Sequence, residues 1–288
     1  FDGTTYSFMY GDVLFLVYSL QDYWKGTYSL STLTSTYLTN DVGNWFREQV
    51  AAHPEAKWRI ALVHKNVFSG SGHQEDEETP LFRETMLPIF KDCEIDLVLQ
   101  GHDHCYEIIG PVNPDTRTPI LDAITDVEEV PVNMVNNMTG KKGGTFRVDD
   151  GTLYFIGATC GTKRYNPNHK LTMEADYEKH KVENYYDLFT GMFGQPGRPS
   201  YSSFTVDGNT ITVNSYKVYK DIDPVLFNTF YIKRTKEHNS GDKQGPISLE
   251  QLIQENGTAK IIYDGSMFIV RENIAYNALG QIVFDKRN

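Results

Sequence analysis

The sequence predicts an α/β domain built around parallel strands, followed by a small β appendage. Two short apolar runs, Trp58–His64 and Ile95–Gly101, are separated by a helical pattern of apolar residues. Strand, helix and strand at this spacing are typical of a right-handed crossover between two parallel strands. Near the carboxyl end, short apolar runs separated by turn residues predict a second, smaller β unit.

Composition and charge exclude several classes of function. The 288 residues have a formal net charge of −11, and nucleic-acid binding depends on clustered Lys and Arg, so no nucleic-acid-binding surface is expected. Three cysteines do not form a disulfide framework. We find no apolar run long enough for a membrane span and no signal peptide. The chain is long enough to bury one large core.

A hairpin and a helix are predicted before the first parallel strand. Apolar residues over 6–10 and 12–18 flank a turn signal at Gly11-Asp12, so this aspartate is interpreted as a turn residue rather than a ligand. A loose connection is expected from Lys25 to Thr39. An amphipathic helix should follow over Asp41–Ala52, capped by the residues just before it.

The helix between the two parallel strands carries its own start signals. Thr79 is a predicted N-cap, and Pro80 would occupy the first helical position. The apolar pattern continues to Cys93, and Pro88 should kink or split the helix. The acidic run 75–78 is interpreted as a solvated approach that favours the helix N-terminus.

The rest of the chain is predicted to be richer in loops. No regular pattern is visible from Gly110 to Gly151. Strands are expected at 152–156 and 225–234, with a hairpin at 203–213 around Asp207-Gly208-Asn209.

The predicted domains are residues 1–235, a linker over 236–246 and the β appendage over 247–288. Strands of the appendage are expected at 260–263, 267–270 and 282–284. A unit of this size is too small to be stable without docking or a partner.

Three histidines follow the two parallel strands where those strands end. His64 closes the first strand, whereas His102 and His104 follow Gly101 after the second. Carboxyl ends of parallel strands meet at one edge of a sheet, which is where open α/β sheets place their sites. Alternate residues of an extended segment point to the same side. Because neutral imidazole is a common ligand for transition metals, the sequence predicts a metal site there.

Two neighbouring residues have more than one interpretation. His73 lies in a glycine-punctuated loop, where a mobile histidine would act as a general acid, bind an anionic substrate, or simply face solvent. Cys105 follows His104 directly and should point away from the ligands. The many Tyr and Phe residues favour core packing over a carbohydrate- or polymer-binding surface.

The histidine motif and its surroundings resemble a known enzyme family. The run Gln100-Gly101-His102-Asp103-His104-Cys105-Tyr106-Glu107, preceded by His64 and His73, is similar to the C-terminal half of a calcineurin-like metallophosphoesterase. The branch it resembles most is the purple acid phosphatases, although Ile108 stands where that branch often has arginine. The resemblance covers about Tyr6 to Arg234. The appendage resembles short C-terminal modules of secreted Bacteroidetes proteins.

The resemblance implies a four-layer α/β/β/α sandwich of mixed sheets and hydrolysis of phosphomonoesters or phosphodiesters at two metal ions. By this likeness His64 and His102 would bind one metal and His104 the other. His73 would contact the phosphate or protonate the leaving group. The metals would be Zn, Mn or Fe, because all accept histidine. The family also implies a periplasmic or secreted protein.

Other motifs of the family are not found in the sequence. Its Asp-x-His, Gly-Asp and Gly-Asn-His motifs supply further ligands, whereas here Gly11-Asp12 opens a strand and Gly43-Asn44 precedes Trp45. Since the chain also begins at Phe1, we expect a fragment that corresponds to the C-terminal portion of the domain and is inactive alone. Its apolar face would be covered by the missing N-terminal half or by self-association. The alternative is a non-catalytic, metallophosphoesterase-like binding or structural domain.

Overall fold

The computed structural model describes residues 4–20, 29, 32–131, 138–167, 182, 185–238, 259–263, 266–271, 274–277 and 281–285. The chain forms two compact units, Phe1–His238 and Asn239–Asn288. In the part of the chain so described, no helix has the length and apolar character that crossing a membrane requires.

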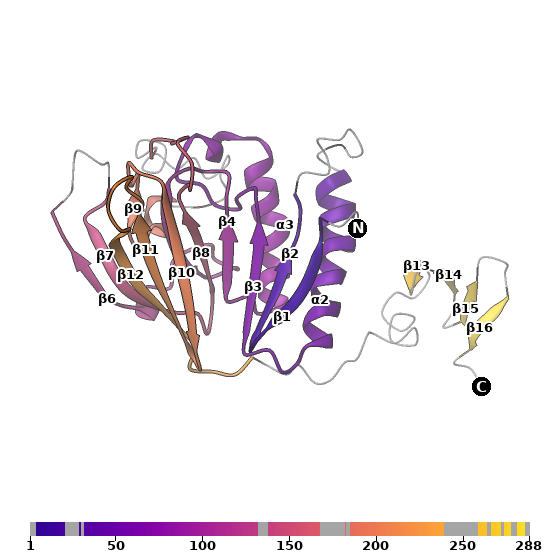
Figure 1. Cartoon of the computed structure of the whole chain (residues 1–288). Coiled ribbons are helices and arrows are strands. Elements are labelled where there is room, and N and C mark those ends of the chain that lie inside the picture. Colours follow the sequence, from indigo (N-terminus) through magenta and orange to yellow (C-terminus); the bar gives the residue numbers. More distant parts are fainter. Residues whose placement is uncertain are drawn as a thin grey trace. The chain divides into compact units, whose positions relative to one another are not determined.

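A seven-stranded mixed sheet organises the first unit, in the order β1-β2-β3-β4-β8-β5-β9 (Figure 1). Its strands are β1 (Tyr6–Tyr10), β2 (Val13–Val17), β3 (Trp58–Val63), β4 (Leu97–Gln100), β5 (Tyr106–Val112), β8 (Thr152–Gly157) and β9 (Phe193–Gly194). The β1–β2 hairpin is confirmed. The parallel pairing of β3 with β4, in which Ala61 lies opposite Val98, is confirmed as well.

The second sheet has five strands in the order β10-β11-β12-β7-β6. They are β6 (Ile124–Glu129), β7 (Lys141–Arg147), β10 (Ser200–Asp207), β11 (Thr210–Lys217) and β12 (Val225–Lys233). The predicted hairpin is the β10–β11 pair. Its turn needs Gly208, whose φ of 54° lies in the left-handed region that favours glycine.

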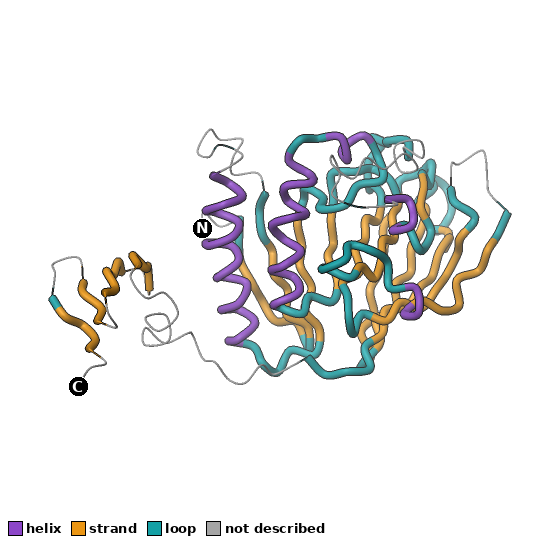
Figure 2. Tube along the Cα trace, turned by 180° about the vertical axis from the view of Figure 1, so that it is seen from behind, coloured by secondary structure: helices purple, strands orange, loops and turns teal. Residues whose placement is uncertain are grey.

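Helices lie on one face of the seven-stranded sheet, and the five-stranded sheet packs against the other face (Figures 1 and 2). The helical layer holds a π-helix (Leu33–Val42), α2 (Gly43–Ala52) and α3 (Glu78–Asp92). The predicted α/β class with two facing mixed sheets is therefore confirmed. The described residues build helix, sheet and sheet layers, including far more of the second sheet than the sequence indicated.

Burial on both faces explains why β3 reads as an almost continuous apolar run. Trp58 and Ile60 enter the core between the two sheets, whereas Ala61 and Val63 enter the core beneath the helices. Alternate residues of a strand point to opposite faces, so a strand in the middle layer has no polar face to show.

The prediction of a loop-rich segment from Gly110 to Gly151 is wrong. It contains the end of β5 together with β6 and β7. The β6 strand lies at a sheet edge, where polar side chains are exposed and the alternation of apolar residues is weak. The β7 strand contains Gly143 and Gly144 at φ of 69° and 112°, which read as turn residues in the sequence.

The two helix starts also differ from prediction. The region before α2 is π-helical from Leu33 rather than loose. Helix α3 starts at Glu78, and Thr79 lies in its first turn, where its Oγ1 donates to the carbonyl of His73 rather than capping α3. The helix continues through Pro88 without splitting, because packing of its buried face outweighs one lost hydrogen bond.

The second unit is a four-stranded antiparallel sheet. Its strands are β13 (Ala259–Tyr263), β14 (Ser266–Arg271), β15 (Ile274–Asn277) and β16 (Ile282–Asp285), in that order. The three expected runs are strands, and β15 was missed. The turn signals Asp264-Gly265 and Ala278–Gly280 lie outside the described residues, as does most of the predicted linker beyond His238.

An apolar surface lies along the edge strand β1. Tyr6, Phe8 and Tyr10 alternate along this strand and are 44–77% exposed. Phe8 stacks on Phe15 of β2, with ring centroids 4.9 Å apart. Large apolar side chains, including Phe204, are also exposed on β10, the edge strand of the other sheet.

A buried ion cluster ties the end of the first unit to the start of β4. The fully buried carboxylate of Asp96 accepts the backbone N–H of Arg59 at 2.7 Å and an ion-pair hydrogen bond from Arg234. Nε2 of His238 lies 3.0 Å from the same carboxylate. Replacing the carboxylate would leave the charge of Arg234 buried without its partner.

We expect Asp96→Asn to lower the free energy of unfolding by about 3 kcal/mol or more, because breaking a buried pair leaves an uncompensated charge. The matched control is Asp12→Asn, which removes an exposed 2.7 Å pair with Lys57 and should lower the free energy of unfolding far less, because solvent screens exposed ion pairs. Urea unfolding of both variants measures the difference. Equal losses would contradict a structural role for the Asp96 cluster.

Candidate metal centre

The site lies where the loops after β3 and β4 meet. His64 follows β3 directly, and the backbone N–H of Gly101, which follows β4, donates to the His64 carbonyl at 3.1 Å. A Cβ on Gly101 would lie only 3.0 Å from His64 Nδ1. The glycine in the motif is thus required for close approach of the first histidine. The rings of His64 and His102 have centroids 5.3 Å apart at an interplanar angle of 74°.

His102 has an unusual backbone conformation. Its φ of 66° lies in the left-handed region, which costs a residue with a Cβ roughly 1–2 kcal/mol. The turn is held by the buried carboxylate of Asp103, which accepts Asn66 Nδ2 at 2.9 Å and the hydroxyl of Ser71. Both donors come from the loop after β3, so this loop stabilises the strained turn.

The loop from Asn66 to Ser71 is buried throughout, and His73, which follows it, is partly buried. Gln100 Oε1 accepts the N–H groups of Val67 and Phe68 at 2.8 and 3.3 Å. The N–H of Gly70 donates to Glu107 Oε2 at 3.0 Å. Polar side chains at the end of β4 and in β5 therefore satisfy the backbone of this loop, which leads to His73.

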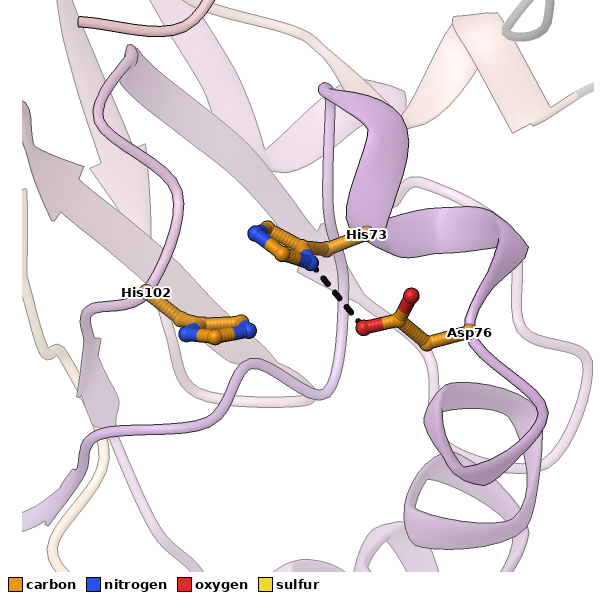
Figure 3. A group of neighbouring side chains, drawn as sticks. All are labelled: His73, Asp76 and His102. Carbon is orange, nitrogen blue, oxygen red and sulfur yellow. Dashed lines mark hydrogen bonds and ion pairs between the residues drawn. The ribbon is translucent and has the colours of Figure 1, made fainter.

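His73, Asp76 and His102 converge (Figure 3). The rings of His73 and His102 have centroids 3.8 Å apart, and His73 Nδ1 lies 2.9 Å from Asp76 Oδ2. One donor atom from each of the three side chains lies within 4.8 Å of the other two. Sequence reasoning missed Asp76, because it sits in an acidic run. The available signal was its spacing of three residues after His73.

His104 has different neighbours. Its ring stacks on Tyr165, with centroids 4.7 Å apart and an interplanar angle of 16°, and its Nδ1 lies 3.2 Å from the Lys163 carbonyl. Tyr165 also meets the edge of His73 at 5.4 Å. No ring contact within the described residues joins His104 to His64 or His102. Tyr165 was not foreseen, since only the fold brings it here.

Cys105 is buried, and its thiol donates to the Tyr165 carbonyl. Burial raises the pKa of this thiol, with smaller contributions from Glu107 and Asp103. A thiol that is held protonated is a poor metal ligand, which agrees with its exclusion from the predicted site.

Electrostatics favour neutral imidazoles. Burial, followed by the charge of His104, lowers the pKa of His64. Burial, followed by the charge of His73, lowers the pKa of His102 to about 4. Neutral imidazole is the form that binds metal, so both side chains are in the ligand form at neutral pH.

A cleft of about 510 Å³ opens beside His64, at the carboxyl ends of β2, β3 and β4. Tyr18, Leu20, Leu62 and Leu99 supply most of its apolar lining. Of the four predicted site histidines, His64 is the one that lines this cleft. The structure thus brings the ring of His102 next to those of His64 and His73. The predicted roles of these histidines and of His104, as metal ligands or as an acid, stay predictions.

Residues 1–106 match the family described as calcineurin-like phosphoesterase. Purple acid phosphatase 3 of Arabidopsis thaliana is 34% identical over 85 residues, which cover 28% of this chain and 21% of that protein. Purple acid phosphatase 4 of the same plant is 31% identical over 100 residues, covering 34% and 27%. An uncharacterized Mycobacterium tuberculosis protein is 27% identical over 126 residues, covering 41% and 23%.

Among solved structures, purple acid phosphatase PPD1 from yellow lupin seeds aligns with a TM-score of 0.49 at 18% identity, covering 80% of this chain and 32% of that one. The matched segments span about a quarter of the length of the curated relatives. The family match at residues 1–106 argues against a chain that holds only the C-terminal half of the domain. His73, Asp76 and His102 form a group that could hold a metal ion. The expectation that the chain lacks metal-binding motifs is therefore not supported.

We expect Gly101→Ala to weaken zinc binding about 10- to 100-fold, because the new methyl group would displace the His64 imidazole, and displaced ligands lose affinity on this scale. Gly72→Ala is the matched control, since a Cβ there meets nothing within 4 Å. Isothermal titration calorimetry with Zn²⁺ compares the two. Similar affinities for both variants would show that His64 does not bind the ion.

A second expectation concerns Glu107, which is fully buried and whose Oε1 has no hydrogen-bond partner among the described residues. Burial, followed by the charge of Asp103, raises the pKa of this carboxyl well above its usual range. A raised folded-state pKa contributes stability below the unfolded pKa, near about 4.3, and this stability is lost as the pH rises through the folded value.

At pH 8 the free energy of unfolding of Glu107→Gln should therefore exceed that of the wild type by about 1 kcal/mol or more, because the amide carries no ionisation cost. At pH 5 the difference should be smaller. Urea unfolding at both pH values measures this. The control is Glu84→Gln, a partly exposed residue 3.5 Å from Arg117, which should show no such difference. A change in unfolding free energy for Glu107→Gln that is the same at both pH values would contradict a raised pKa for Glu107.

Proposed function

We propose that this protein, a calcineurin-like metallophosphoesterase over residues 1–106 with purple acid phosphatase homologues, hydrolyses phosphate monoesters or diesters with the help of transition metals. The observation that carries the proposal is the meeting of His64, His102 and His73 at the carboxyl ends of β3 and β4, inside the matched segment.

The donor residues fit such metals. Two imidazoles that bind one ion at about 2.1 Å and a tetrahedral angle have ring centroids roughly 5 Å apart, and those of His64 and His102 are 5.3 Å apart. His104 places Nδ1 against a backbone carbonyl, which leaves Nε2 for an ion in the manner usual for metal-binding histidines. We assign His64 and His102 to one metal and His104 to a second, with Zn, Mn or Fe as the candidates.

The bound metals would supply Lewis-acid polarisation of the phosphoryl group. The chain itself supplies orientation and hydrogen bonding. His73 turns Nδ1 toward Asp76, so its Nε2 is the nitrogen available to a phosphate oxygen or to the leaving group. Tyr165, between His73 and His104, forms an aromatic wall on which the substrate's ester group can rest.

Location and partners follow from the same likeness. We propose a periplasmic or secreted protein, with a phosphate-ester small molecule as substrate. The exposed side chains of β1 and β10 support a further polypeptide partner, either more of the same domain or a second copy of the chain.

One observation favours a different function. The described residues offer one group of three converging His and Asp donors, whereas hydrolysis at a dinuclear centre usually needs carboxylates that bridge and neutralise two ions. A non-catalytic metal-binding domain with a single ion is the second candidate.

Hydrolysis of p-nitrophenyl phosphate and bis(p-nitrophenyl) phosphate, with Zn²⁺, Mn²⁺ or Fe²⁺ added, tests the proposal. We expect His102→Ala to lower kcat/KM about 100-fold or more, because it removes a metal ligand. His53→Ala, at the end of α2 beside Glu55, should leave it unchanged. Turnover that survives His102→Ala would refute the assigned site, and metal binding without turnover would favour the non-catalytic domain.

A further inference from the structure

We propose that His73, Asp76 and His102 form a binding site for one divalent transition-metal ion, a ligand set that shares His102 with the one assigned above and adds His73 and Asp76 to it. The site is complete within the described residues and uses two imidazoles and one carboxylate. It requires neither phosphate-ester hydrolysis nor a second ion, so binding of this ion can be measured separately from the turnover that the proposed function predicts.

The distances suit a shared ion. Donor atoms bound to one ion at 2.0–2.2 Å lie roughly 3–4 Å apart. His73 Nδ1 and Asp76 Oδ2 are already 2.9 Å apart, and all three donors lie within 4.8 Å of one another. The ring centroids of His73 and His102, 3.8 Å apart, are closer than the roughly 5 Å of two imidazoles on one ion, so side-chain rotations that separate the rings must accompany binding. In Figure 3 nitrogens of both rings and the Asp76 carboxylate face a common space.

The backbone holds His73 and Asp76 in place. They lie on and just after a single 3₁₀ turn, Gly72–Glu75, whose spacing brings both side chains to one side. The His73 carbonyl accepts the N–H of Asp76 at 3.2 Å and the hydroxyl of Thr79 at 2.9 Å. The third ligand comes from the turn after β4. Two ligands are therefore fixed by local hydrogen bonds, and the third arrives from a separate element.

Partial burial suits an ion that exchanges with solvent. The side chains of His73 and Asp76 are 24% and 35% exposed, so water can complete the coordination. Two neutral nitrogens and one negative oxygen suit Zn²⁺, Mn²⁺, Fe²⁺ or Co²⁺, whereas Ca²⁺ and Mg²⁺ prefer ligands that are all oxygen. The ion would join the Gly72–Asp76 segment to the turn at His102 and would stabilise the folded chain by mass action.

Metal-free protein titrated with Co²⁺, followed by its visible absorption, and with Zn²⁺, followed by calorimetry, tests the site. We expect Asp76→Asn and His73→Gln to weaken the binding of one ion at least 10-fold, the usual scale for a lost ligand. His53→Gln, which changes a histidine beside Glu55, is the matched control, in which this ion should bind as in the wild type. Asp76→Glu keeps the carboxylate and should retain binding, which separates loss of a ligand from loss of the fold.

The inference is overturned when Asp76→Asn and His73→Gln bind both metals as the wild type does, or when His53→Gln weakens binding as much as Asp76→Asn. Thermal unfolding of each metal-free variant checks that it folds. Hydrolysis of p-nitrophenyl phosphate in the same samples keeps the two proposals apart. If metal binding depends on Asp76 and no turnover is seen, the result supports this site alone. If turnover is seen and Asp76→Asn binds metal as the wild type does, the result supports the proposed function alone.

Discussion

The hydrogen bonds between the loop after β3 and the turn after β4 determine the geometry of the candidate site. Gly101 reaches the His64 carbonyl, and Asp103 holds Asn66 and Ser71. Without these bonds the left-handed backbone at His102 would have no compensation, and the two histidine-bearing segments would be independent loops. A site on two segments is only as well defined as the contacts that join them.

Burial makes these bonds strong and also makes them necessary. The carboxylates of Asp103 and Glu107 lie behind the histidines, away from water, where each hydrogen bond matters more than at the surface. The same burial lowers the pKa of His64 and His102 and raises that of Glu107. Desolvation therefore favours the neutral form of these imidazoles and of a nearby carboxyl.

The surrounding sheets serve to place these groups. Parallel pairing of β3 with β4 brings the two turns to one edge, and a core on each face of the middle sheet keeps the strands rigid. At the opposite edge, the Asp96 cluster joins the start of β4 to the segment after β12. The site thus lies at the end of well-packed strands, while the exposed apolar edges lie on β1 and β10.

The sequence by itself determined the α/β class, the β1–β2 hairpin, the parallel pair and the histidines at its carboxyl edge, because apolar periodicity and strand ends are local signals. It did not reveal β6 and β7, whose polar residues and glycines become strands only through pairing with each other and with β12. Only the tertiary structure placed Asp76 and Tyr165 beside the histidines and showed that the loop over Asn66–Ser71, just before His73, is buried. Contacts between residues distant in sequence depend on how the layers pack, and no local pattern records that.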